Sequence, residues 1–130
     1  MKFHQTKHAP AAIGPYSQAV AVDGWLYTSG QVGLDPKTGK MVSGENPEET
    51  FKAQAHQVIE NLQAVLKNAG CHFSDVVKAT IYVTDLANFA ILNEIYGDAM
   101  GAHRPARSTV QVAGLPAGAL VEIDLVARIS

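Results

Sequence analysis

The sequence lacks the features that are typical of disulfide-stabilised, membrane-spanning or nucleic-acid-binding proteins. It holds a single cysteine among 130 residues, so no intrachain disulfide can form, which suits a reducing cytoplasm. No apolar run approaches the roughly 18 residues that span a bilayer, and the first five residues lack the apolar core of a secretory signal. The net charge is −2 with no basic stripe, which makes nucleic-acid binding an unfavoured function.

The remaining composition is typical of a globular protein. Hydrophobic residues make up 47% of the chain and charged residues 17%, and no repeat or linker divides it. A chain of this length suits one domain with one core, so residues 1–130 are expected to form a single domain. We therefore expect a cytoplasmic protein with no membrane partner.

Turn and cap residues predict the elements of the first half. Asp23-Gly24 separates two short apolar runs, which is a signal for a β-hairpin. Asn46 and Pro47, followed by two acidic residues, predict the start of a helix. One apolar stripe then follows at helical spacing, and Gly70 is placed to end the helix. The stripe consists of Phe51, Ala55, Val58, Leu62, Val65 and Ala69.

The second half predicts further strands around a second helix. Residues 76–84 alternate as a strand, a helix begins near Asp85, and residues 108–113 and 120–128 form the last strands. The expected core faces of the first and last of these strands are Val77, Ala79, Ile81 and Val83, and Val121, Ile123, Leu125 and Ala127.

This order of elements predicts an α+β fold, in which a mixed β-sheet carries two helices packed on one face. The other face would then hold Trp25, Tyr27, Leu120 or Val126. A bare apolar face predicts a partner, most simply a second copy of this chain.

Two charges stand out in the apolar strands near the end of the chain. Arg107 and Glu122 lie on two runs that are adjacent in sequence, and a half-buried charge is costly unless it is paired or used. Arg107 offers a planar fork for a carboxylate, and Glu122 can exchange a proton. A pocket for a small anion and a structural Arg–Glu ion pair are both consistent with this spacing.

Motifs spread over nearly the whole chain resemble the RidA family, also called YjgF/YER057c/UK114. They are residues 8–18, 28–31, 83–89, 93–96 and 105–115 together with 121–123. The resemblance implies an α+β fold similar to Bacillus-type chorismate mutase. It also implies a homotrimer in which the sheets form a central barrel and three ligand clefts lie between subunits.

The same resemblance implies a function as an enamine/imine deaminase, a hydrolase that requires neither a metal nor an organic cofactor. Its substrates would be 2-aminoacrylate and 2-iminobutyrate, which pyridoxal-phosphate-dependent dehydratases release. Its products would be 2-keto acids and ammonia. Arg107 would grip the substrate carboxylate, and Glu122 would position and activate the water that attacks the imine carbon.

Five further residues enter the expected site. Tyr16 would be catalytic, and Ser29, Gly30, Asn93 and Thr109 would bind the substrate. The alternatives are a packed aromatic for Tyr16, turn chemistry for Ser29 and Gly30, and a loop clamp for Asn93. Thr109 stands where many relatives carry cysteine, which argues against a thiolate mechanism but leaves its backbone N–H for the ligand.

Two other functions stay open at this point. A non-catalytic regulatory trimer could use the same cleft to sense a small ligand; it would need Arg107 but would have less need of Glu122. A ribonuclease or translation inhibitor, as described for some relatives, is disfavoured by the slightly acidic charge balance.

Overall fold

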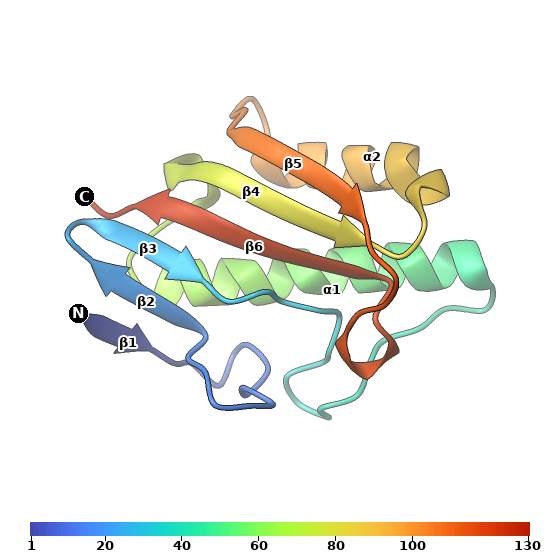
Figure 1. Ribbon diagram of the computed structural model, residues 1–130, viewed down its shortest axis with the longest axis horizontal. Coiled ribbons are helices and arrows are strands. Elements are labelled where there is room, and N and C mark those ends of the chain that lie inside the picture. The colour runs from blue at the N-terminus through green and yellow to red at the C-terminus, as the bar shows by residue number, and fades with distance from the viewer.

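The computed structural model describes all 130 residues, and all six strands join one mixed sheet with two helices behind it (Figure 1). The spatial strand order is β1-β2-β3-β6-β4-β5, and only the β4–β5 pair is parallel. This confirms the predicted α+β class. The elements are β1 Lys2–His4, β2 Ala19–Val22, β3 Trp25–Thr28, α1 Pro47–Asn68, β4 Val76–Val83, α2 Phe89–Met100, β5 Ala106–Gln111 and β6 Val121–Arg128.

The structure confirms the predicted β-hairpin turn and the predicted helix cap. Asp23 and Gly24 join β2 to β3 with φ values of 51° and 83°, as a type I′ turn requires. The side chain of Asn46 accepts a hydrogen bond of 2.9 Å from the backbone N–H of Glu49, which caps α1. The apolar stripe of α1 packs against the sheet, and neither helix has the length and apolar character needed to cross a membrane.

The main core lies between the helices and one face of the sheet. Val121, Ile123, Leu125 and Ala127 of β6 are all fully buried there, as predicted from their alternation. The residues between them are only half-buried and belong to the opposite face. β6 therefore separates an apolar side from a polar side, and it does so at the centre of the sheet.

The prediction for β4 is wrong at Val77. A β-bulge between Val76 and Lys78 shifts the register, so Val76 takes the core position and Val77 is 40% exposed. A bulge adds one residue to a strand and so reverses the parity on one side of it. Ala79, Ile81 and Val83 keep their predicted core positions because they follow the bulge.

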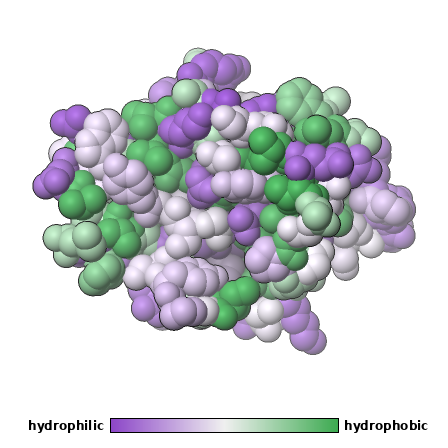
Figure 2. Space-filling model, in the orientation of Figure 1, coloured by the Kyte–Doolittle hydropathy of each residue, from purple (hydrophilic) through white to green (hydrophobic).

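The face of the sheet opposite the helices is uncovered (Figure 1). By strand register, Trp25, Tyr27 and Val126 lie on it, as predicted, whereas Leu120 instead packs against the main core. Polar residues of β4 and β6 share this face, and Figure 2 shows apolar and polar side chains intermixed across it. The uncovered face is therefore a mixed surface rather than a continuous apolar one.

Buried amides fasten the long loops to the framework. The Asn61 side chain is fully buried in α1 and donates to the carbonyl oxygens of Val32 (3.1 Å) and Leu34 (2.9 Å). The Gln18 side chain donates to the carbonyl oxygens of Thr6 (3.0 Å) and Pro10 (2.8 Å). These bonds hold the segments that precede β2 and follow β3, which are the segments that carry Tyr16 and Gly30.

Asn61→Ala is expected to lower the free energy of unfolding by about 1–3 kcal/mol, because the carbonyl of Leu34 loses the donor that Asn61 supplies. Urea denaturation measures this loss. Glu60→Ala, at the exposed neighbouring position of α1, is the control and should change the midpoint little. Equal midpoints for the Asn61 variant and the wild type would contradict the anchoring role.

Candidate active site

The two charged residues lie on opposite faces of the sheet. Arg107 of β5 pairs in register with Ala79 of β4, which is fully buried beneath the helices, so Arg107 belongs to the helix side. Glu122 of β6 pairs with Tyr82 on the uncovered face. β4 also lies between β5 and β6. The alternative of an Arg107–Glu122 ion pair within the chain is therefore wrong.

Arg107 has neutral neighbours on α2. Its Nη2 donates a hydrogen bond of 2.7 Å to Oδ1 of Asn93, and its guanidinium carbon lies 5.5 Å from the Phe89 ring centre and 5.0 Å from that of Tyr96. Thr109 follows two residues later on the same face of β5, where its hydroxyl is buried without a partner. Asn93 thus contacts the arginine and clamps no loop.

Arg107 also lacks an acidic partner. The only ion pairs of the chain join Lys52 to Glu48 and Glu49, both at 3.6 Å. A half-buried guanidinium without a counter-ion keeps its charge available to an outside anion. Its planar fork matches a carboxylate, which it can grip with two parallel hydrogen bonds.

Glu122 lies against the segment that follows β3. A Cβ atom at Gly30 would come within 2.7 Å of the Glu122 carboxyl group, so a larger residue there would have to displace the end of the Glu122 side chain. Gly30 and Tyr16 line one small hollow together with Ile13. Tyr16 is 46% exposed, so it is not packed in the core of this chain.

Ser29 fastens this side of the site. Its hydroxyl donates to the carbonyl of Ser17 at 2.5 Å, and its backbone N–H donates to the carbonyl of Gln18 at 2.9 Å. These bonds tie the end of β3 to the segment that carries Tyr16. The structure thus brings Tyr16, Ser29, Gly30 and Glu122 together, and it groups Arg107, Asn93 and Thr109 elsewhere.

The surroundings of Glu122 raise the pKa of its carboxyl group. Burial raises the pKa of Glu122 above its ordinary value, and the nearby charge of Asp124 raises that pKa further. Burial likewise raises the pKa of Asp124, while a hydrogen bond from Tyr82 opposes the change. A carboxyl group whose pKa is raised toward neutrality can both accept and return a proton.

Sequence reasoning missed the roles of Phe89, Tyr96 and Asp124. Phe89 and Tyr96 entered the sequence analysis only as members of the motifs at residues 83–89 and 93–96, although their spacing with Asn93 places all three on one helix face. Asp124 has the same strand parity as Glu122, and that parity was the signal for a second acid beside it.

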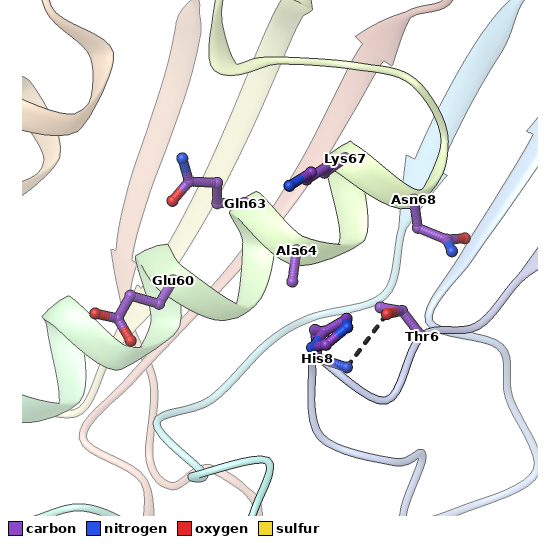
Figure 3. A pocket seen from close by; sticks show the side chains of 7 residues that line it. All are labelled: Thr6, His8, Glu60, Gln63, Ala64, Lys67 and Asn68. Atoms are coloured by element: carbon purple, nitrogen blue, oxygen red, sulfur yellow. Dashed lines mark hydrogen bonds between the residues drawn. The ribbon is translucent and has the colours of Figure 1, made fainter.

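A separate groove of the surface lies between α1 and the N-terminal segment (Figure 3). None of the predicted site residues lines it. In Figure 3 the side chains of Glu60, Gln63 and Asn68 point away from one another, so they do not converge on a common ligand position. The groove is lined by Thr6, His8, Glu60, Gln63, Ala64, Lys67 and Asn68.

Comparison with known proteins defines the class of this sheet and site. The family model described as Endoribonuclease L-PSP matches residues 6–129, so the chain belongs to this family, which is also known as the RidA (YjgF) family. The resemblance seen in the motifs is thereby confirmed. A 2-iminobutanoate/2-iminopropanoate deaminase of Mus musculus is 50% identical over 126 residues, which cover 97% of this chain and 90% of the mouse protein.

Solved structures agree with this assignment. RidA from an Antarctic Psychrobacter species superimposes with a TM-score of 0.92 at 46% identity, covering 99% of this chain and all of the other. TdcF of E. coli with bound serine superimposes with a TM-score of 0.90 at 38% identity and full coverage of both chains. The structural similarity therefore extends over the whole chain and is not limited to the matched motifs.

The midpoint for protonation of Glu122 is expected to lie above 4.5, since both burial and Asp124 raise its pKa. Asp124→Asn should lower that midpoint but leave it above 4.5, because burial is the larger cause. Carboxyl ¹³C NMR titration measures it, with Glu122→Gln to assign the resonance. A wild-type midpoint at or below 4.5 would contradict this account of the site.

Proposed function

We propose that this protein is a 2-iminobutanoate/2-iminopropanoate deaminase that hydrolyses reactive 2-imino acids to 2-keto acids and ammonia. The observation that carries the proposal is the half-buried Arg107 fork, which has no acidic partner in the chain. The names of relatives at about 50% identity support the same activity. The imines would be those that pyridoxal-phosphate-dependent dehydratases release.

In the proposed reaction, Arg107 binds the substrate carboxylate and orients the imine carbon. Glu122 accepts a proton from a water molecule as its oxygen attacks that carbon, which forms a carbinolamine. Glu122 then returns the proton to the nitrogen and the C–N bond breaks. As the carbinolamine oxygen forms the C=O bond, Glu122 takes up its hydroxyl proton and passes it to the departing ammonia, so that ammonium and the 2-keto acid leave. An iminium is already electrophilic, so the proposed route uses neither metal nor cofactor, and general acid–base help of roughly 10²–10⁴-fold suffices.

The opposite placement of Arg107 and Glu122 leads us to propose a site built from two copies of the chain. A homotrimer, similar in fold to Bacillus-type chorismate mutase, would bury the uncovered sheet faces in a central barrel. Each of its three clefts would combine Arg107 of one copy with Glu122 of the next. The mixed polar and apolar character of that face suits an interface of this kind.

The remaining predicted residues fit subordinate roles in this proposal. Tyr16 would present its ring and hydroxyl to the substrate beside Glu122. Gly30 would let the ligand approach the backbone, and Ser29 would hold the segment that carries both. Thr109 would offer its backbone N–H beside the carboxylate anchor. The single, buried Cys71 suits the reducing cytoplasm that we propose as the compartment.

A regulatory ligand-binding trimer is the second candidate. The solved structure of TdcF with bound serine favours it, because a relative with the same fold holds a small amino acid. The name of the family model points instead to ribonuclease activity. For this chain, the net charge of −2 favours a small molecule over RNA.

A coupled assay tests the proposed activity. Threonine dehydratase generates 2-iminobutyrate, semicarbazide competes for it, and 2-oxobutyrate is followed over time. The wild type should accelerate keto-acid formation. Arg107→Ala should lower kcat/KM by about 100-fold because a bidentate charged contact is lost. Glu122→Gln should lower kcat by roughly 10²–10⁴-fold while binding of 2-oxobutyrate persists.

Lys52→Ala, which removes a cation far along the chain from both residues, is the control and should behave as the wild type. No acceleration by folded wild type, together with retained 2-oxobutyrate binding, would favour the regulatory candidate. Turnover unaffected by Glu122→Gln would remove Glu122 from the mechanism.

Mixing two inactive variants tests the shared site. Arg107→Ala and Glu122→Gln chains, unfolded together in equal amounts and refolded, should recover about a quarter of wild-type activity, because one cleft in four receives both intact residues. Light scattering should give three times the chain mass of 13.8 kDa for each sample. If mixed assemblies form but activity is not restored, the proposal that Arg107 and Glu122 of one site come from two different copies is wrong.

A further inference from the structure

Three side chains on one face of α2 surround the guanidinium of Arg107. Phe89, Asn93 and Tyr96 are spaced by four and three residues, so they form a single stripe along the helix. We infer that this stripe, here named the arginine cage, is a positioning element that fixes the direction in which Arg107 offers its free N–H groups to a substrate carboxylate. The inference rests on the proposed function of Arg107 as the anchor.

The geometry leaves one part of the guanidinium free. Asn93 occupies a donor on Nη2 at 2.7 Å, and the two rings lie near the guanidinium carbon at 5.5 and 5.0 Å. A guanidinium carries five N–H donors in one plane, so four remain. The rings attract the cation but accept no strong hydrogen bond, so they restrict its movement without consuming those donors.

The cage is also uncharged. An amide oxygen holds the guanidinium without neutralising it, whereas a carboxylate in the same place would compete with the substrate. Arginine has a long side chain that loses much rotamer freedom on binding, and a side chain that is already held loses less. The cage therefore keeps Arg107 both charged and pre-organised.

Each residue of the cage contributes a different kind of restraint. Phe89 is 42% exposed, so its ring stands at the surface beside the anchor and not in the core. Tyr96 is 7% exposed, and its hydroxyl has no hydrogen-bond partner in the chain. Its ring rather than its hydroxyl therefore makes the contact with Arg107.

Steady-state kinetics of imine hydrolysis test the cage. Phe89→Leu and Asn93→Ala should each raise KM by about fivefold with kcat within about twofold, because the restraint acts on binding of the carboxylate. Asn93→Asp keeps the shape but adds a competing charge, so its KM should rise more. Tyr96→Leu should raise KM, and the conservative Tyr96→Phe should recover most of that loss because the ring is kept.

Glu94→Ala is the matched control on α2, since Glu94 is exposed and outside the stripe. Thermal melts should show Phe89→Leu and Asn93→Ala folded as the wild type, because both residues are exposed. An unchanged KM in both variants of an active enzyme, or an equal rise in Glu94→Ala, would overturn the inference.

A measurement on the ligand-free protein separates this inference from the proposed function. The Nε–H resonance of Arg107, assigned with Arg107→Lys, should be displaced by the ring currents of the cage in the wild type and in Glu94→Ala. It should move toward the position of free arginine in Phe89→Leu. A displaced resonance in a wild type that shows no turnover would support the arginine cage and contradict the proposed deaminase activity. A resonance that Phe89→Leu leaves unchanged would overturn the arginine cage alone.

Discussion

The two-residue period of a β-strand separates Arg107 from Glu122, and the rest of the candidate site depends on that separation. Arg107 faces the helices, where an amide and two aromatic rings surround it. Glu122 faces the uncovered side, where burial and the charge of Asp124 raise its pKa. If the two groups touched in one chain, each would hold the other in its charged form and occupy its hydrogen bonds. Because the two groups do not meet within one chain, Arg107 keeps its charge available to an outside anion.

Local signals in the sequence predicted most of the framework. The hairpin, the cap of α1 and the buried face of β6 depend on a few neighbouring residues, and all three were confirmed. Val77 was misplaced because a bulge reverses the alternation without any residue type that requires it. The spatial order β6-β4-β5 was also out of reach, since periodicity gives the faces of a strand but not its neighbours.

The residues of the candidate site could be predicted from motifs in the sequence, but most of the contacts between them could not. The resemblance supplied both Gly30 and Glu122, but only the sheet register explains their relation, because it brings Gln31 opposite Ile123. Because Gly30 lies against the Glu122 carboxyl group, a larger side chain at this position would displace that carboxyl group. The surroundings of Arg107 follow from helix spacing, yet an aromatic residue in a helix with an apolar face is ordinarily interpreted as core.

Several loop segments of this protein are held by side-chain amides, and amides do not titrate. Gln18, Gln54 and Asn61 hold backbone groups of loop segments that are distant from them in the sequence. Their hydrogen bonds keep the same strength in acid and in base, and they owe little to ionic strength because neither partner is charged. Acid stress would therefore leave these amide contacts intact while it protonates carboxyl groups, among them Glu122 and Asp124 of the uncovered sheet face. The anchoring of these loop segments is therefore independent of the protonation on which the proposed chemistry depends.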